Sequence, residues 1–461
     1  MNIVIIGAGS IGSYLALIFS QEGYRVILVD TDPHKLERAS RDLDIATRVG
    51  DGADWELLED LMDFSPDIFI ALTNDDEKNL VACNIAKQLG YPQTIARVRK
   101  VKYFLQSRLN FEQMFCVDHL IGPEKLTADS IANMILMPGS IAIENFAHGD
   151  VQMRTLKIPH TWRKEGIRLA DRAKIDLPKD VMVGLIRRKA EHKLHGKVVS
   201  HKEQIIFPHG NDLVLPGDEV TFIGVTEEIR TLHRLFSVSM RMPKSAMIVG
   251  GSLIGTHLAR TLREYDIRTV ILENDYAKCR FLAESLPATT IVHRDGMDYN
   301  YLQSENAGAY DVFVACTRDD ATNFLSGSIA RNVGCENVII SLAGTEYLPI
   351  TSQLQISQAA SPRVNAANRI LSIARKKTVA SMVSMYNNQA EVMEVKVSMD
   401  SKIAGIPIRY LGPHLPDEML LVVIQSRGRI FIADGNRVLS PGDTLIVISA
   451  PKYVDDLRRL F

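Results

Sequence analysis

The chain opens on an apolar run and a glycine turn, Ile3-Val4-Ile5-Ile6-Gly7-Ala8-Gly9-Ser10-Ile11-Gly12. The run Asn2–Ile6 is typical of a strand that is covered on both faces of its sheet. Apolar residues then recur at helical spacing at Ile11, Leu15 and Ile18. A second apolar run closes on Asp30. This opening predicts a strand, a glycine turn, a helix and a second strand.

The glycines have the Gly-x-Gly-x-x-Gly spacing of a nucleotide-binding turn. In such a turn Gly7 makes the sharp bend, Gly9 lets the backbone approach a pyrophosphate, and Gly12 lets the helix pack closely on the strand. The helix N-terminus then presents free N–H groups and a positive dipole end to the phosphates. We therefore predict nucleotide binding; the alternative is a tight turn with a purely structural role.

Asp30 at the end of the second strand indicates which nucleotide would bind. A carboxylate there accepts hydrogen bonds from the adenine-side ribose and repels a 2′-phosphate. Thr31 and Asp32 follow it, and no arginine is present there that would favour that phosphate. Asp30 therefore favours NAD(H) over NADP(H), although the ribose of ATP or ADP would satisfy the same carboxylate.

Buried strands and helices continue to alternate, which predicts a doubly wound parallel sheet. Ligands bind such sheets at the carboxyl ends of the strands. The candidate ligand contacts at or near those ends are Asp51, Thr73, Asn74 and Arg97. Thr73 and Asn74 could hydrogen-bond ribose or amide groups, and Arg97 could pair with a phosphate. Each of these residues could instead cap a turn or form a surface ion pair.

The first Rossmann-like domain is expected to end with a sixth strand at Phe115–Asp118 and a helix at Thr127–Met137. After Met137-Pro138-Gly139 the pattern changes to short strands separated by turns, which indicates a small α+β domain. The predicted fold class is α/β, with two tandem Rossmann-like doubly wound parallel-sheet domains, each followed by a small α+β domain.

An internal repeat is the basis for that tandem arrangement. The turn at Gly7 recurs at Gly250, 243 residues later, and Asp30 recurs at the same offset as Glu273. One residue further on, at an offset of 244, Asp51 matches Asp295 and the run Thr73–Asn79 matches Thr317–Asn323. Pro-Gly-Asp at 216–218 recurs at 441–443. We predict Rossmann-like domains at 1–139 and 244–380 and small domains at 140–236 and 381–461.

The second copy of the glycine turn differs from the first. Ser252 replaces the middle glycine and adds a Cβ atom and a hydroxyl where a pyrophosphate would approach. Glu273 keeps the ribose-binding acid, and Arg318 replaces Asn74 and would suit an additional phosphate. Ser341 stands where Arg97 would recur. The candidate contacts of a second ligand, NAD(H) or ATP/ADP, are Gly250, Gly251, Ser252, Leu253, Ile254, Gly255, Glu273, Asp295, Thr317 and Arg318.

Composition is that of a soluble globular protein with more than one domain. The chain has 461 residues, 46% hydrophobic and 23% charged, and its net charge of −2 provides no basic field for nucleic acid. Its five cysteines form no Cys-x-x-Cys pair, which argues against a zinc ribbon or a disulfide framework. The start lacks a basic signal region, and the apolar runs are far shorter than the ~20 residues of a membrane span. We expect a cytoplasmic protein.

No catalytic set accompanies the two nucleotide-binding domains. His192 and His195 could share a helix face, but no third ligand is evident, so we expect a solvated polar segment and no metal site. A dehydrogenase needs a proton donor or acceptor beside the nicotinamide, and none is apparent. Sensing is therefore favoured over turnover. The alternatives are an NAD-dependent oxidoreductase with an unrecognised substrate site and a scaffold whose nucleotide is structural.

Over its whole length the chain resembles the TrkA family, the cytoplasmic nucleotide-binding subunits of bacterial Trk potassium-uptake systems. In that family two tandem RCK units each combine a Rossmann lobe with a small lobe. The resemblance rests on the duplication and on Gly7–Gly12, Asp30, Thr73–Asn79, Ile95–Arg97 and Asp118–Glu124.

The resemblance implies a regulatory role rather than catalysis. It implies NAD(H) at Gly7–Ile11, Asp30, Thr73, Asn74 and Arg97. It also implies a homo-oligomeric ring of RCK units on the inner face of the cell membrane, attached through a TrkH-type potassium-transport subunit that the nucleotide would gate.

Overall fold

The structure is a computed structural model that describes residues 1–41, 43–104, 109–136, 140–162, 166–171, 176–194, 197–232, 235, 242–344, 347–351, 353–374, 379–386, 389–412, 415–416 and 418–460. The chain forms two compact units. The first unit combines Met1–Ile135 with Pro243–Ile370, and the second combines Leu136–Met242 with Leu371–Phe461. Both halves of the chain therefore contribute to each unit.

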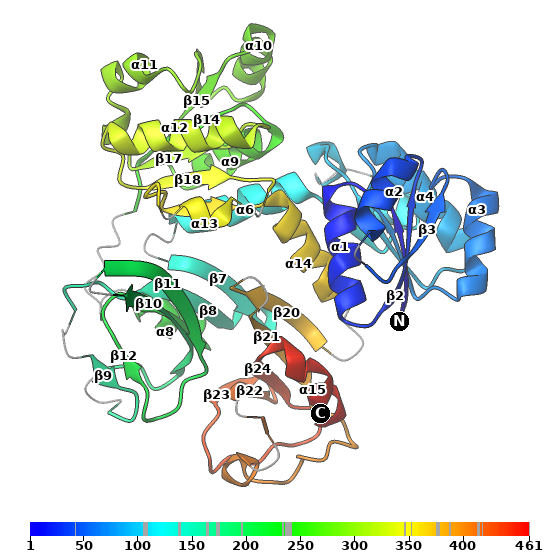
Figure 1. The fold of residues 1–461 in the computed structure, drawn as a ribbon, viewed down its shortest axis with the longest axis vertical. Coiled ribbons are helices and arrows are strands. Elements are labelled where there is room, and N and C mark those ends of the chain that lie inside the picture. Colours follow the sequence, from blue (N-terminus) through cyan, green and yellow to red (C-terminus); the bar gives the residue numbers. More distant parts are fainter. Residues whose placement is uncertain are drawn as a thin grey trace. The chain divides into compact units, whose positions relative to one another are not determined.

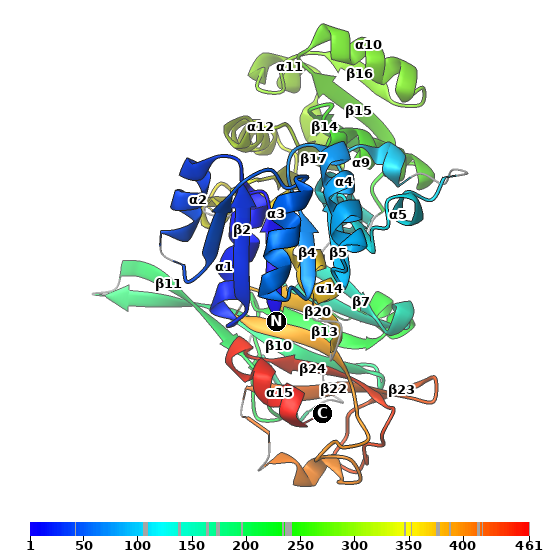
Figure 2. The ribbon, with the colours of Figure 1, turned by 90° about the vertical axis from the view of Figure 1, so that its right-hand side faces the viewer.

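The first Rossmann lobe is a six-stranded parallel sheet with helices on both faces (Figures 1 and 2). Its strands, in the order β3-β2-β1-β4-β5-β6, are β1 (Asn2–Ile6), β2 (Arg25–Asp30), β3 (Ala46–Val49), β4 (Ile68–Ala71), β5 (Gln93–Arg97) and β6 (His119–Ile121). Its helices are α1 (Ser10–Gln21), α2 (Pro33–Ser40), α3 (Trp55–Asp60), α4 (Asp76–Gln88), α5 (Phe111–Met114) and α6 (Pro123–Leu136).

The sequence of helix α1 explains why this helix packs on the first sheet. Ile11, Leu15 and Phe19 lie on one face of the helix and are buried, so the helix is held on the sheet by apolar contact. The helix is followed by Gly23, which has a left-handed φ of +75° that a side chain would disfavour. The chain can then turn back at once into β2.

The expected sixth strand at Phe115–Asp118 was wrong by a few residues. Phe115 instead follows α5 as its C-cap, and Cys116 has a left-handed φ of 51°, which breaks an extended run. The Asp118 carboxylate accepts a hydrogen bond from the Thr94 backbone N–H at 2.8 Å. Only after this anchor does the chain pair with β5, as β6. The helix expected at Thr127–Met137 begins earlier, at Pro123, and Met137 lies outside the described residues.

The second Rossmann lobe repeats this topology with parallel strands in the order β16-β15-β14-β17-β18-β19. The strands are β14 (Ser245–Val249), β15 (Arg268–Glu273), β16 (Thr290–His293), β17 (Val312–Ala315), β18 (Val338–Ser341) and β19 (Gln358–Ala360). The helices are α9 (Leu253–Glu264), α10 (Tyr276–Ser285), α11 (Tyr299–Ser304), α12 (Asp320–Asn332), α13 (Leu348–Thr351) and α14 (Pro362–Ala374). The predicted fold class, with its repeated parallel sheet, is confirmed.

The two Rossmann lobes contact each other within the first unit. The Arg363 guanidinium of α14 lies 5.3 Å from the centroid of the Tyr14 ring of α1, and the two helices run side by side in Figure 1. His257 Nε2 of α9 lies 3.3 Å from Asp129 Oδ1 of α6. The lobes are therefore joined by specific polar contacts as well as by the chain.

The second unit contains two five-stranded antiparallel sheets. The first has the order β11-β10-β13-β8-β7, with strands β7 (Ser140–Phe146), β8 (Val151–Lys157), β10 (Val181–Leu194), β11 (Lys197–Ile206) and β13 (Glu219–Val225). The second has the order β20-β21-β24-β22-β23, with strands β20 (Val379–Met385), β21 (Ala390–Lys396), β22 (Met419–Ser426), β23 (Arg429–Ile432) and β24 (Thr444–Ser449). One apolar cluster contains Leu185 and Ile223 of the first sheet together with Val392 and Ile448 of the second.

The segment expected to be polar and turn-rich between Val181–Arg187 and Gln204–Ile206 forms instead a long hairpin of β10 and β11. His192 pairs with Ser200 in this hairpin, so it lies on a strand and the predicted helix face is wrong. His195 lies outside the described residues. Backbone pairing does not depend on apolar side chains, which is why hydrophobic periodicity missed this part of the hairpin. The four domain boundaries predicted from the sequence stay predictions.

Candidate nucleotide-binding site

A cleft of about 490 Å³ opens at the carboxyl end of β1 in the first lobe. Strand order reverses there, since β2 and β4 lie on opposite sides of β1, and that position is where doubly wound sheets bind ligands. The cleft brings together most of the residues predicted from the sequence, which are Gly7, Gly9, Ser10, Ile11, Asp30, Asp51, Thr73, Asn74 and Arg97. Two lysines that the sequence analysis missed, Lys35 and Lys78, also line it.

The glycine turn has the geometry that its spacing predicts. Gly7 has a φ of +104°, and a Cβ atom there would lie 3.1 Å from the Thr73 backbone nitrogen. A Cβ atom at Gly12 would collide with the Gly7 carbonyl oxygen, so the helix can approach the turn only without a side chain. Gly9 is different, because a Cβ atom there would meet nothing within 4 Å. Gly9 therefore keeps the space in front of α1 open.

The N-terminus of α1 has no side-chain cap. Gly9 is its N-cap residue, and no side chain accepts a hydrogen bond from the first turn. Unpaired N–H groups at a helix N-terminus attract anions. The open end of α1 can therefore accept phosphate oxygens.

Asp30 is held in place by backbone donors on both sides of its carboxylate. Its Oδ2 accepts a hydrogen bond from the Ala8 N–H at 2.7 Å, and its Oδ1 accepts one from the Asp32 N–H at 2.9 Å. Ala8 itself is buried and does not line the cleft. Each carboxylate oxygen has a further lone pair, so Asp30 retains acceptors for two hydroxyl groups.

Asp51 and Lys78 form an ion pair across the cleft. Lys78 Nζ donates to Asp51 Oδ2 at 2.6 Å, and the Ala53 N–H donates to Asp51 Oδ1 at 3.0 Å. The hydrogen bond from Lys78, followed by that from Ala53, lowers the pKa of the Asp51 carboxyl group. Both side chains are more than one third exposed, so either can exchange this partner for a ligand.

Thr73 has a structural role in the β4–α4 turn. Its hydroxyl donates to the Oδ1 atom of the buried Asn79 at 2.6 Å, and its N–H donates to the same oxygen at 3.0 Å. The Asn79 amide in turn donates to the carbonyl oxygens of Thr73 and Arg97. Asn79 therefore ties the ends of β4 and β5 together, and it was not recognised from the sequence as part of the site's support.

The second lobe repeats this arrangement with Asn323. Thr317 donates to Asn323 Oδ1 from both its N–H and its hydroxyl, and the Asn323 amide donates to the Thr317 and Ser341 carbonyl oxygens. Asp76 and Asp320 also correspond, since each accepts two backbone hydrogen bonds from the loop after the next strand. The Thr-x-Asp-Asp-x-x-Asn repeat therefore maintains the strand ends in both lobes.

Arg97 lies at the base of the cleft with partners of its own. Its guanidinium donates to Asn74 Oδ1 at 3.2 Å and lies 3.6 Å from Glu124 Oε1. Burial lowers the pKa of Arg97, and the nearby Glu124 carboxylate opposes that shift. Arg97 is thus a cation that is already paired within the first lobe, and its guanidinium orients Asn74.

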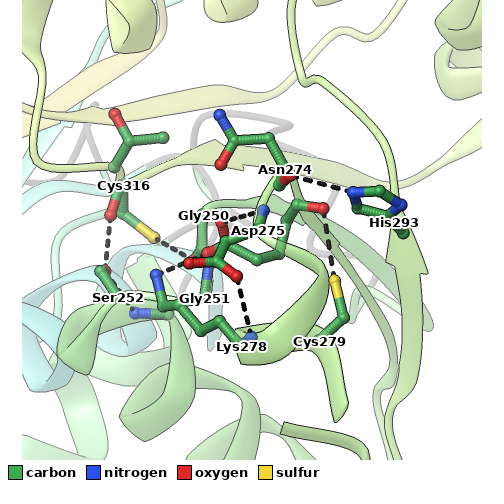
Figure 3. A network of polar contacts seen from close by, with 12 residues as sticks. Gly250, Gly251, Ser252, Asn274, Asp275, Lys278, Cys279, His293 and Cys316 are labelled. Carbon is green, nitrogen blue, oxygen red and sulfur yellow. Dashed lines mark hydrogen bonds and ion pairs between the residues drawn. The ribbon is translucent and has the colours of Figure 1, made fainter. Parts of the chain in front are cut away.

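In the second lobe a side chain closes the end of the helix that the first lobe leaves open (Figure 3). Ser252 is the N-cap of α9, and its Oγ accepts a hydrogen bond from the Gly255 N–H at 3.2 Å. The same hydroxyl donates to the Cys316 carbonyl oxygen at 2.6 Å. The serine thus uses a donor of the first turn and joins α9 to the end of β17.

The acid of the second lobe is also more fully paired. Glu273 Oε2 accepts from the Gly251 N–H at 2.9 Å and from Lys278 Nζ at 2.6 Å, and Oε1 accepts from the Asp275 N–H. Burial favours a raised pKa for Glu273, but the hydrogen bonds, led by that from Lys278, lower it. The equivalent lysine in the first lobe, Lys35, is 3.9 Å from Asp30.

The other candidate residues of the second lobe divide into turn, helix and loop positions. Gly250 has a φ of +99°, and Gly251 packs against Leu282, whose counterpart in the first lobe is Ala39. Ile254 and Gly255 are buried in the first turn of α9. Asp295 accepts a hydrogen bond from the Met297 N–H at 2.9 Å.

Two candidates lie somewhere unexpected. Leu253 and Arg318 line a cavity of about 390 Å³ together with first-lobe residues that include Asn74 and Lys100. Both residues are also predicted contacts of the second ligand. Their place beside the first lobe could not be predicted by comparing the two repeats.

Comparison with known proteins defines the family. The TrkA-N domain model matches residues 3–123 and 246–362, and the TrkA-C domain model matches residues 392–461. The chain belongs to the TrkA family. Its two tandem repeats are RCK units, as the resemblance implied.

Relatives of this TrkA-family chain match it from end to end. The Trk system potassium uptake protein TrkA homolog 1 of Methanosarcina mazei is 28% identical, with 100% of both chains covered. The Trk system potassium uptake protein TrkA of Halomonas elongata is 29% identical over 100% of this chain and 98% of its own length. The chain is a homologue of potassium-uptake proteins over its full length.

A solved structure has the same fold. The GsuK channel bound to NAD has a TM-score of 0.65 and 15% sequence identity, covering 99% of this chain and 78% of that chain. At this level of identity the likeness concerns the fold, and it agrees with the two parallel sheets described above.

The described part of this TrkA-family chain shows neither a metal-binding cluster nor a membrane-spanning helix. Among the described residues, no group of three or more His, Cys, Asp or Glu side chains converges in a way that could hold a metal ion. Nor does any helix in the described part of the chain have the length and apolarity that crossing a membrane requires.

Proposed function

We propose that this chain is a nucleotide-responsive regulatory subunit of a potassium-uptake system, with NAD(H) as the ligand of the first cleft. The observation that carries the proposal is the pairing of an open, uncapped α1 N-terminus at Gly9 with the preoriented carboxylate of Asp30. A dinucleotide needs both an anion-binding helix end and a ribose acceptor at this spacing. Membership of a potassium-uptake family supports the regulatory role.

Several residues of the first cleft have a role in this proposal. The N–H groups of Ser10 and Ile11 bind the pyrophosphate, and Asp30 binds the adenine-side ribose. Asn74, held by Arg97, contacts the other half of the dinucleotide. The ion pair of Asp51 and Lys78 closes over the ligand or releases Lys78 to a phosphate.

Regulation would arise from a difference in affinity between two shapes of the protein. A ligand shifts such an equilibrium only as far as it binds one shape more tightly than the other. Coupling of about 1–3 kcal/mol, which is about 5- to 150-fold, is sufficient. We propose that the chain assembles as a homo-oligomeric ring of RCK units, located in the cytoplasm against a TrkH-type membrane subunit, and that the nucleotide gates that subunit without being consumed.

The second glycine turn is proposed to bind NAD(H) or ATP/ADP more weakly than the first. A ligand there has to displace the hydroxyl of Ser252 from its two hydrogen bonds before it reaches the helix end. It also meets a Glu273 carboxylate that Lys278 already neutralises. We also propose that the Rossmann-like domains span residues 1–139 and 244–380 and the small domains residues 140–236 and 381–461.

The test is to replace Asp30 by alanine in the full chain and to measure NADH, NAD, ADP and ATP binding by calorimetry. Hydrogen bonds to a charged group contribute about 1.5–3 kcal/mol each, so NADH affinity should fall at least about 10-fold. The exposed Asp63→Ala in the same lobe is the matched control.

Potassium flux through vesicles that contain the membrane partner should lose its dependence on nucleotide in the Asp30→Ala protein. Unchanged affinity together with unchanged flux control would contradict the proposal. Steady NADH consumption by the purified wild-type chain would instead support an oxidoreductase.

A further inference from the structure

A second cavity adjoins the first cleft, inside the unit that contains both Rossmann lobes. Its volume is about 390 Å³. The second lobe contributes Leu253 and Arg318 to its walls, and the first lobe contributes Asn74, Asp75, Asp76, Glu77, Arg99 and Lys100. The cavity is therefore built from residues of both repeats.

The two cavities share a wall. Asn74 and Asp75, which follow β4, line both of them. In the first sheet β2 and β4 flank β1, so a ligand that begins at Asp30 and crosses the glycine turn moves next toward Asn74. A dinucleotide places its second nucleoside on that side of the sheet. The cavity with Arg318 lies where such a ligand would continue.

Most charges around this second cavity are already paired within the first lobe. Lys100 Nζ donates to Glu77 Oε1 at 2.6 Å, and the Tyr103 hydroxyl donates to the same carboxylate at 2.8 Å. Arg99 Nε donates to Glu124 Oε1 at 2.9 Å. The carboxylates of Asp75 and Asp76 accept backbone hydrogen bonds, so each charged first-lobe residue of the wall has a partner within that lobe.

Arg318 is the exception among these charges. Within the described part of the chain no hydrogen bond or ion pair involves its side chain, and the residue is exposed. A guanidinium offers five N–H donors in a planar fork. Leu253, beside it, offers apolar surface on which a ring can rest. A polar ring system with hydroxyl and carbonyl acceptors matches this combination.

We infer that the Arg318 cavity receives the second nucleoside of a dinucleotide whose adenosine half occupies the first cleft. This inference rests on the function proposed above and extends it. The ligand spans the two lobes, with Arg318 donating to ribose hydroxyl or carboxamide oxygens. Arg318 thus distinguishes a dinucleotide, which reaches it, from a mononucleotide such as ADP, which ends before Asn74.

This arrangement makes the ligand a link between repeats. A dinucleotide that contacts both lobes binds best when they are at one mutual angle, whereas ADP contacts the first lobe alone. NAD(H) and ADP therefore have different effects on the lobes even though they share one adenosine site.

The test compares Arg318→Ala with wild type by titrating the full chain with NADH and with ADP. Loss of a charged donor should weaken NADH binding about 10-fold and leave the ADP dissociation constant within twofold. The exposed Arg280→Ala on α10 of the same lobe is the matched control and should change neither. Because Arg318 has no described partner within the chain, the unfolding midpoint should not move.

Every outcome decides the inference. Selective loss of NADH affinity supports it, while unchanged affinity for both nucleotides overturns it. Equal loss for NADH and ADP also overturns it, because Arg318 would then contact the shared part of the ligands. If the wild-type chain binds neither nucleotide, the proposed function fails first and the inference fails with it.

Discussion

One substitution can weaken nucleotide binding at the first glycine turn without destabilising the fold. In Gly9→Ser the first turn acquires the side chain that the second has at Ser252. The backbone already suits it, since Gly9 has φ −75° and ψ −174° and Ser252 has φ −66° and ψ 174°. A Cβ atom at position 9 meets nothing within 4 Å. Because a serine N-cap is no worse than a glycine N-cap, the first lobe should be at least as stable as in the wild type.

NADH binding should weaken in Gly9→Ser although the lobe stays folded. By analogy with Ser252, the new hydroxyl accepts from the N–H of Gly12 and donates to the Leu72 carbonyl oxygen, the counterpart of Cys316. A ligand has to break both hydrogen bonds, at about 0.5–1.5 kcal/mol each. The combined 1–3 kcal/mol corresponds to a loss of about 5- to 150-fold in NADH affinity.

The assay is calorimetric titration with NADH beside thermal unfolding of the same Gly9→Ser preparation. Gly412→Ser, at an exposed glycine of the other unit with open space around it, controls for the added hydroxyl. The reciprocal Ser252→Gly should bind a second equivalent of nucleotide more tightly than wild type. The reasoning is refuted if Gly9→Ser keeps its NADH affinity within twofold while its unfolding midpoint does not fall.

Three further predictions concern hydrogen bonds and ion pairs within the two Rossmann lobes. Replacing Asn79 by alanine removes four hydrogen bonds, so the free energy of unfolding of the first lobe should fall by about 4 kcal/mol. Hydrogen exchange should become faster at the end of β4, and unchanged exchange there would count against the role given to Asn79. The hydrogen bonds from Lys100 and then Tyr103 lower the pKa of Glu77 to about 2. The ionised Glu77 should therefore stabilise the fold fully above pH 4.5, the ordinary pKa of the group, and this stabilisation should disappear as the pH falls toward 2. NMR titration should show the pKa of Glu77 rising in Lys100→Ala, and an unchanged pKa would contradict the assignment. Lys278→Met leaves the buried Glu273 carboxylate without its cation, and chemical denaturation should show that the free energy of unfolding falls by about 1–3 kcal/mol. This loss is smaller than for a fully buried pair because Lys278 is 38% exposed. A more stable variant would refute the pairing.

The parallel sheets and the first cleft could be predicted because local sequence determines them. Apolar runs of strand length, the glycine spacing and the acid at Asp30 are all readable within 30 residues. The repeat then extended the prediction to the second lobe. The sixth strand was displaced because Cys116 takes a left-handed backbone conformation that no apolar pattern signals.

The roles of individual polar residues were harder to predict. Thr73 was assigned to a ligand, yet its hydroxyl is used by Asn79, six residues further along. A polar residue at a strand end can contact a ligand or support the turn, and only the hydrogen-bond geometry distinguishes these two roles. Arg318 was assigned to its own lobe because sequence comparison aligns it with Asn74, whereas its cavity depends on packing between lobes.

The interleaving of both halves in each unit has an evolutionary consequence. In an assembly of identical single repeats, any substitution in the glycine turn would appear at every cleft at once, and loss of binding would be complete. Covalent linkage ensures that one copy of each repeat is always paired with the other, at a high effective concentration. Ser252 could then arise in one turn while Gly9 remained in its twin. Two glycine turns in one chain are thus under separate selection, so that one can change while the other does not.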